Sequence, residues 1–481
     1  MALLLFLTFA AWSFASAVGG SPDEDYVLTS IWCGTEGNPP HCRKDPDRFW
    51  GMILPIMAAE PSLCLRLGGQ VTSAICQTEI YDQEISTDLL NWGLFPARFF
   101  DSMRFFVGSD VEASVVKMRL FNSFLAAVLI TVAVSLDWRR SADTFIAWLV
   151  VAAPVTIYFI ASVNASSWTL IGTTCFTIAT LTALKNRSTV KIWLPATVLA
   201  LVSIWLTNAS RSEGILTLAI IFVAIIAFEF KPTTIVFNVQ TVVTALSSVV
   251  ALALLYFRLA DKIKSAIVFR DSVEEYSGEF AIGGTNLLIN NILNLPRFFM
   301  GFFGRWGLGW FEIELSSTIW LSSLEATLIV FAYSLLRSSK SEKKLLLTLC
   351  IFLCSAVLYL HQNELVPVGI AIQPRYFLPL FLGIVIIATF LKSQSFPRWL
   401  LRTIAILAIV ANSFALRETI RRYTTGQDIL SSKSLNQSIE WWWKFGPQPE
   451  TIWLVGTLAF IFLFILIDSE SKNRYSSKTH D

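Results

Sequence analysis

Runs of about 20 apolar residues recur along the whole chain, and they restrict its fold more than any other feature of the sequence. A run of this kind crosses a bilayer as a helix, because the membrane interior offers no water to bond the backbone. Only 15% of the 481 residues are charged, against roughly a quarter in ordinary soluble domains. The sequence therefore predicts an all-α polytopic membrane protein. About twelve runs are present, near residues 2–19, 119–136, 143–161, 167–184, 191–207, 214–230, 235–257, 317–336, 344–360, 376–391, 399–415 and 450–467.

The distribution of Lys and Arg predicts the orientation of these helices, because cationic loops resist translocation. If the N-terminus is inside, the basic loops and the C-terminal tail all fall on the cytoplasmic side. They contain Arg139 and Arg140; Lys185, Arg187 and Lys191; Lys231; residues 337–344; Lys392 and Arg398; and Lys472, Arg474 and Lys478. We therefore expect a multi-pass protein of the cytoplasmic membrane with both termini in the cytoplasm.

The connections on the other side of the membrane are much longer than the inward ones. We expect a first transmembrane helix at 1–19, a first extracytoplasmic loop at 20–118, transmembrane helices 2–7 at 119–257, an extracytoplasmic loop at 258–316, transmembrane helices 8–12 at 317–467 with an outer loop at 416–449, and a cytoplasmic tail at 468–481. An alternative is open for the first run, because Phe14-Ala15-Ser16-Ala17 resembles a signal-peptide cleavage site. The longest loops therefore lie outside the cytoplasmic membrane, in a compartment where ATP and nucleotide sugars are not expected to be present.

Four of the seven cysteines lie in the first outer loop, at Cys33, Cys42, Cys64 and Cys76. An even number of cysteines in an oxidising compartment predicts two disulfides. Three pairings fit four cysteines, and we favour the local pairs Cys33–Cys42 and Cys64–Cys76. A four-thiolate zinc site is the alternative, although these spacings are wider than those of usual zinc ligands.

Two segments have the character of surface-lying pieces. In the first outer loop, Phe95, Phe99, Met103 and Phe106 recur at helical spacing, which is typical of a helix on a membrane surface. The stretch 287–310 is too rich in glycine for one clean helix and fits a re-entrant or surface piece.

Three consecutive acids, Asp23, Glu24 and Asp25, follow the first apolar run directly. They have a purely structural explanation: Ser21 as N-cap, Pro22 at the first helical position and Glu24 form a capping box. That box leaves Asp23 and Asp25 without a use. Adjacent carboxylates in a partly dehydrated cleft raise one another's pKa, and one of them can then act as a general base.

The acidic motif belongs to a larger pattern that covers most of the chain. The pattern resembles the GT-C glycosyltransferases, which transfer sugars from polyprenyl-phosphate or polyprenyl-diphosphate carriers, and more narrowly a bacterial, mainly actinobacterial, membrane family of unknown function. The pieces that carry the resemblance are Pro22-Asp23-Glu24, the spaced Cys64 and Cys76, Ser162 to Ser167, Ser210-Arg211-Ser212, Phe303-Gly304 to Trp310-Phe311-Glu312, and Gln373-Pro374-Arg375-Tyr376-Phe377-Leu378-Pro379.

The resemblance implies an inverting transfer of a sugar from a polyprenyl-phosphate donor to a cell-envelope glycan or lipid acceptor, on the extracytoplasmic face. Such a reaction needs a base for the acceptor hydroxyl and a cation for the departing phosphate. We expect Asp23 to be the base, with Glu24 or Asp25 as its partner or as a metal ligand. Arg375 with Tyr376 is the expected phosphate site, with Arg211 and Arg305 as substitutes, because guanidinium groups offer paired donors to phosphate. Some GT-C relatives use Mg²⁺ or Mn²⁺ and others do not, so the metal stays open.

Other functions fit parts of the sequence. A secondary transporter or flippase of lipid or glycan substrates suits twelve spans with both ends inside. However, the inward link at 230–234 is short, and charges within the spans are scarce. A non-catalytic membrane partner of a glycan pathway is a third hypothesis. The net charge of +2 supports no nucleic-acid partner. The sugar, the acceptor and the oligomeric state are not determined by the sequence.

Overall fold

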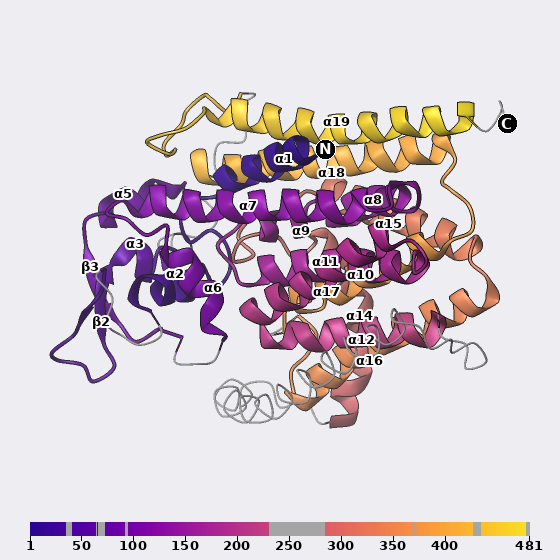
Figure 1. The fold of residues 1–481 in the computed structure, drawn as a ribbon. Helices are drawn as coiled ribbons and strands as arrows, with labels where there is room; N and C mark the ends of the chain where they lie inside the picture. The colour runs from indigo at the N-terminus through magenta and orange to yellow at the C-terminus, as the bar shows by residue number, and fades with distance from the viewer. Residues whose placement is uncertain are drawn as a thin grey trace.

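The computed structural model describes residues 1–34, 41–63, 65, 73–91, 95–229, 284–369, 372–426 and 434–477. Long helices dominate these residues and run side by side, with short helices and a small sheet gathered at one end of the bundle (Figure 1). In the described residues, seven helices are long and apolar enough to cross a membrane. They are α7 (Val111–Ser135), α10 (Ser166–Lys185), α11 (Val190–Ser210), α15 (Ser317–Leu336), α16 (Lys340–Asn363), α18 (Arg398–Thr424) and α19 (Pro449–Ser477).

These helices confirm a mostly helical membrane protein, and each coincides with one of the predicted apolar runs. Three shorter elements, α1 (Ala2–Ala15), α12 (Ser212–Glu229) and α17 (Leu378–Leu391), coincide with further runs. The predicted run at 235–257 lies outside the described residues. The count of about twelve spans therefore stays a prediction.

Two predicted runs differ from the helices that form. The first helix ends at Ala15, well before residue 19, and the chain turns at Gly19, whose φ of 76° is in the left-handed region. The run at 143–161 is broken into α8 (Trp138–Ala152) and α9 (Val155–Ile160). Pro154 separates the two helices, because proline has no N–H for the helical ladder and its ring clashes with the preceding turn.

The first loop folds into a small unit that covers one end of the bundle. We call that end of the bundle, together with the unit, the capped end. The unit is built of α2 (Glu24–Cys33), β1 (Arg43–Lys44), β2 (Met52–Pro55), α3 (Ile56–Ala59), η1 (Ala74–Cys76), α5 (Gln77–Ile80), β3 (Glu84–Thr87) and α6 (Ala97–Arg104). The strands pair antiparallel in the order β1-β2-β3, with Met52 opposite Thr87. Figure 1 shows this unit beside the ends of α7 and α18.

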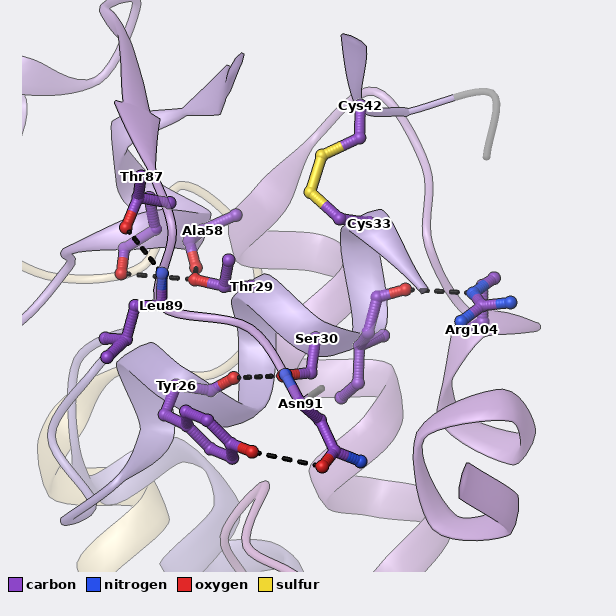
Figure 2. The surroundings of a disulfide bond; sticks show 12 residues. Tyr26, Thr29, Ser30, Cys33, Cys42, Ala58, Thr87, Leu89, Asn91 and Arg104 are labelled. Carbon is purple, nitrogen blue, oxygen red and sulfur yellow. Dashed lines mark hydrogen bonds between the residues drawn. A yellow bond between two sulfur atoms is a disulfide. The ribbon is translucent and has the colours of Figure 1, made fainter. Parts of the chain in front are cut away.

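A disulfide between Cys33 and Cys42 closes the end of α2 onto the segment before β1 (Figure 2). This pair confirms the first of the two predicted local pairs, so Cys33 and Cys42 are not available as zinc ligands. Cys76 is also disulfide-bonded, and its predicted partner, Cys64, lies outside the described residues. Asn91 ties α2 down further, because its N–H donates to Ser30 Oγ at 2.9 Å and its Oδ1 accepts from Tyr26 Oη at 3.1 Å.

Replacing Cys33 and Cys42 together by Ser is expected to destabilise the capped end. The bridge closes a loop with a sequence separation of 9, and the loss of that constraint on the unfolded chain costs about 2–3 kcal/mol. Limited proteolysis of the purified protein measures this effect as faster cleavage within the first loop. Cys350→Ser is the control, since Cys350 carries a free thiol. Equal protease resistance of the double variant and the control would contradict the expectation.

The apolar stripe predicted to face a membrane surface packs on the protein instead. Phe99 and Met103 of α6 are fully buried, and the Phe99 ring lies 5.2 Å from Trp168 of α10. Helix α14 (Gly284–Met300) does form in the glycine-rich stretch, and it ends where Gly301 begins a short 3-10 turn. Its Ile289 and Leu293 are exposed, as a surface piece in lipid requires.

Candidate functional site

Asp23 brings two arginines together from distant parts of the chain. Its Oδ2 accepts a hydrogen bond from Arg375 Nη2 at 2.7 Å and lies 3.5 Å from Arg211 Nη2. Arg375 is in the turn η3 (Pro374–Tyr376) before α17, whereas Arg211 separates α11 from α12. The three predicted site residues therefore meet at the capped end, although hundreds of positions separate them.

Asp23 holds an unusual backbone conformation. Its φ of 64° is left-handed, a region that Asp and Asn tolerate better than most residues. The preceding segment is fixed by donors from other elements: Asn164 Nδ2 donates to Pro22 O at 2.7 Å, and Tyr158 Oη donates to Gly20 O at 2.6 Å. The αL turn at Asp23 is thus held from outside, and it aims the carboxylate at the two arginines.

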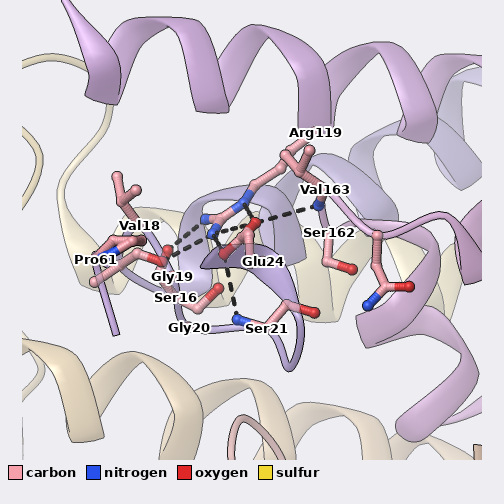
Figure 3. Close-up of polar contacts among 12 residues, drawn as sticks. Ser16, Val18, Gly19, Gly20, Ser21, Glu24, Pro61, Arg119, Ser162 and Val163 are labelled. Atoms are coloured by element: carbon pink, nitrogen blue, oxygen red, sulfur yellow. Dashed lines mark hydrogen bonds and ion pairs between the residues drawn. The ribbon is translucent and has the colours of Figure 1, made fainter. Parts of the chain in front are cut away.

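Glu24 is committed to a buried ion pair with Arg119 of α7 (Figure 3). Arg119 Nη2 lies 2.9 Å from Glu24 Oε2, and both side chains are 1% exposed or less. The Glu24 carboxylate also accepts from the backbone N–H groups of Ser21 and Val163, both at 3.3 Å. Glu24 therefore acts as a structural counter-ion.

Arg119 also closes the end of the first helix. Its guanidinium donates to three carbonyl oxygens there, Ser13 at 3.2 Å, Ser16 at 2.5 Å and Ala17 at 2.8 Å. Carbonyl groups at a helix C-terminus lack partners within the helix, and a cation satisfies them well. Arg119, on α7, is thereby bonded both to the end of α1 and to Glu24 at the start of α2.

The predicted capping box forms only in part, because α2 begins at Glu24 and its N-cap is Asp23. Glu24 does accept from the Ser21 N–H, but the Ser21 hydroxyl makes no cap bond to α2. Asp25 is buried as well: it accepts from Tyr26 N at 2.8 Å and from Ser62 Oγ at 3.2 Å. Of the three acids, Asp23 alone has a side chain with substantial exposure, at 34%.

A cavity of about 510 Å³ begins at the two arginines. Polar groups of Arg211, Glu213, Arg375 and Tyr376 line one part of it. The remaining wall is apolar and comes mainly from α12, α16 and α17, through Leu216, Ile220, Phe352, Ala356, Leu360, Phe377 and Leu380. Leu216 and Phe352 are both exposed, so the cavity reaches the lateral surface between α12 and α16.

The two guanidinium groups still have donors to offer. Arg375 Nε and Nη1 and Arg211 Nε are buried and make no hydrogen bond to the described part of the chain. Burial lowers the pKa of Arg375, but the Asp23 carboxylate and the Tyr376 hydroxyl raise that pKa by more, so the group stays cationic. Buried donors on a fixed cation at the mouth of a cavity are suited to an anion.

Aromatic rings surround both cations. The Arg375 guanidinium lies 5.6 Å from the Phe159 ring and 5.3 Å from the Tyr376 ring, and Arg211 lies 5.3 Å from the Phe95 ring. These contacts hold the planar groups in place without using their N–H donors. Glu213 pairs with Arg211 at 3.2 Å and balances part of the charge.

A second polar cluster contacts the turn that precedes Asp23, at Gly20. Tyr423 Oη donates to Glu312 Oε1 at 2.9 Å and lies 3.4 Å from Gly20 O. Burial of its carboxyl group raises the pKa of Glu312, against the hydrogen bonds that the carboxyl accepts. Gly20 has to be glycine here, because a Cβ would lie 2.6 Å from Tyr423 Oη. The Glu312 cluster supports the turn and does not line the cavity.

Arg305 is the predicted site residue that the structure does not bring to Asp23. It is exposed and stacks on Trp320, 5.7 Å from the ring, and it does not line the cavity. Among the described residues, no group of three or more His, Cys, Asp or Glu side chains could hold a metal ion. The divalent cation stays a prediction, since one or two carboxylates together with substrate phosphate can also hold Mg²⁺.

Sequence reasoning missed Arg119, which decides the role of Glu24. One signal was available, since an arginine at the start of an apolar run requires a buried partner. The sequence could not show which of the three adjacent acids pairs with Arg119, because that depends on the tertiary structure.

Comparison with known proteins places most of this site in one family model. A model described as "Predicted membrane protein (DUF2142)" matches residues 103–384, which is more than half of the chain. The match includes Arg119, Arg211 and Arg375, whereas Asp23 precedes it. No curated protein and no solved structure matches the chain.

Proposed function

Because this chain belongs to the DUF2142 family of predicted membrane proteins, and because its two arginines open onto an apolar cavity, we propose that it is a membrane glycosyltransferase of GT-C type. It transfers a sugar from a polyprenyl-phosphate donor to a cell-envelope glycan or lipid acceptor. The observation that carries this proposal is the junction of Arg375 and Arg211 with the apolar wall of α12, α16 and α17. A lipid phosphate needs both parts, a cation for its head group and an apolar channel for its chain.

The shape of the cavity supports a lipid substrate over a free phosphate. Exposed apolar side chains at its mouth between α12 and α16, including Leu216 and Phe352, let a prenyl chain extend from the cavity into the bilayer. A water-soluble anion gains nothing from such a wall, because apolar surface stabilises only apolar groups.

The arrangement of charges supports the following reaction. The acceptor hydroxyl attacks the anomeric carbon of the donor sugar and loses its proton to Asp23. The bond between that carbon and the phosphate oxygen breaks, and its electron pair leaves with the phosphate. Arg375 and Arg211 stabilise the phosphate as its charge develops. Attack from the face opposite the phosphate inverts the configuration of the sugar.

The location follows the same proposal. The positive-inside pattern supports an orientation with the capped end, and with it Asp23, outside the cytoplasmic membrane and with both termini in the cytoplasm. Donors on lipid carriers are the activated sugars that suit this compartment, because nucleotide sugars are not expected there.

Arg375→Gln is expected to weaken the binding of undecaprenyl phosphate roughly 10- to 100-fold, because it removes a charged, multidentate partner of the phosphate. Arg375→Lys should recover only part of the loss, since an ammonium cannot bond two phosphate oxygens as a guanidinium does. Binding of the lipid to the purified protein in nanodiscs, measured by thermophoresis or native mass spectrometry, checks both.

Arg305→Gln is the matched control, because it removes the same charge from a site that does not line the cavity. Its affinity should equal that of the unchanged protein. If Arg305→Gln weakens binding as much as Arg375→Gln, the phosphate does not bind at the Asp23 site.

A further inference from the structure

The Asp23 carboxylate occupies part of the donor set that a lipid phosphate would use. One oxygen, Oδ2, contacts Nη2 of both Arg375 and Arg211. These are the same guanidinium groups that line the polar part of the cavity. An anion bound there would lie beside a carboxylate that is held by the same two cations, and like charges at such a distance repel.

The site is built so that the carboxylate can leave while the cations stay. Asp23 is 34% exposed on its side chain, whereas Arg375 is 4% exposed and is held between Phe159 and Tyr376. Arg375 Nε and Nη1 make no hydrogen bond to the described residues. A phosphate can therefore bind to these two donors before the Asp23 carboxylate dissociates from Nη2. The backbone at Asp23 is held by its neighbours, and only the side chain has to rotate.

We propose that Asp23 is an internal competitor of the donor phosphate, and that donor binding displaces its carboxylate from Arg375 and Arg211. This role rests on the lipid-phosphate site proposed above. The displaced carboxylate keeps its lone pairs free for the acceptor hydroxyl, so the base becomes available only when the donor is bound. The two arginines therefore hold the base until the donor binds, so the acceptor hydroxyl is deprotonated only when the donor is in place.

Competition makes an unusual prediction for the affinity of the donor site. Asp23→Asn removes the competing charge, so undecaprenyl phosphate should bind roughly fivefold more tightly to this variant than to the unchanged protein. Asp101→Asn is the matched control, because Asp101 pairs with Arg104 on α6, away from the cavity, and its affinity should not change. Nanodisc binding of the lipid to the three proteins gives the comparison.

A second measurement needs no variant. Undecaprenyl phosphate should increase the labelling of Asp23 by a carbodiimide and a nucleophile, read by mass spectrometry, while labelling of Asp101 stays constant. Equal or weaker binding by Asp23→Asn, together with unchanged labelling, would overturn the competition even if Arg375→Gln still loses the lipid. In that case the proposed function stands. If the unchanged protein shows no saturable binding, the lipid-phosphate site and the competition both fail.

Discussion

Asp23→Asn is expected to abolish the glycan product while the protein still folds and enters the membrane. In the proposed reaction the carboxylate takes the proton of the acceptor hydroxyl, which an amide cannot do, so transfer should fall by roughly 10²- to 10⁴-fold. Some stability should be lost, because the change removes the carboxylate that pairs with the buried Arg375. The protein should still fold, since the amide oxygen can accept from the same guanidinium and the buried Glu24–Arg119 pair is untouched. Incorporation of labelled sugar from lipid-linked donors, in membranes that contain the variant, measures the effect.

A control variant and the alternative functions give results that differ from this expectation. Asp101→Asn removes an exposed carboxylate from the same loop and should leave the product unchanged. Normal product from Asp23→Asn would mean that this residue serves only to begin α2. A transporter would instead move lipid across reconstituted vesicles without forming any glycosidic bond, and that result would replace the glycosyltransferase proposal.

Glu24→Gln is expected to cause a large loss of stability at the capped end. It leaves the Arg119 guanidinium buried without its counter-ion, and breaking a buried pair in this way costs about 3–5 kcal/mol. Arg119→Met should cost at least as much, since it also removes the donors from three carbonyl groups at the end of α1. Thermal unfolding of the detergent-solubilised protein, together with yield in the membrane, measures the loss.

A double variant tests whether the pair itself is responsible. Glu24→Leu with Arg119→Met removes both charges, so it should lose less stability than the sum of the two single changes. Glu84→Gln is the matched control, because Glu84 pairs with Arg43 on the exposed sheet, where such pairs contribute less than about 1 kcal/mol. Equal effects of Glu24→Gln and Glu84→Gln would show that the buried pair has no special importance.

The three acids show where sequence reasoning reached its limit. It selected the segment of Asp23 as a candidate site, because an acidic triplet after an apolar run is locally visible. It also selected Arg211 and Arg375, and the structure brings both to Asp23. It expected Asp25 to be free of structural contacts, whereas Ser62 and the Tyr26 N–H bind this carboxylate in the interior. Nothing local distinguishes Asp23 from Asp25, since their side-chain chemistry is identical.

The break at Pro154 and the burial of α6 are two further features that the sequence pattern did not predict. Hydropathy averaged over a window cannot see a single proline that interrupts the backbone ladder. The helical spacing of Phe99 and Met103 correctly predicts that α6 has one apolar face. The same apolar face would form whether the helix packs on lipid or on another part of the protein. Trp168, which packs against Phe99, comes from a distant helix, so the sequence near α6 could not reveal which partner it meets.

By itself, the sequence determined that the chain is a helical membrane protein and where most of its long helices lie, and it pointed to the acids after the first apolar run as candidate site residues. Hydrophobic length and periodicity are local properties, so they can be read along the chain. The tertiary structure alone decided which acid meets the arginines, which one is neutralised by Arg119, and that Arg305 stays apart. Burial and charge pairing depend on contacts between segments hundreds of residues apart, and only the packed helices bring those segments together.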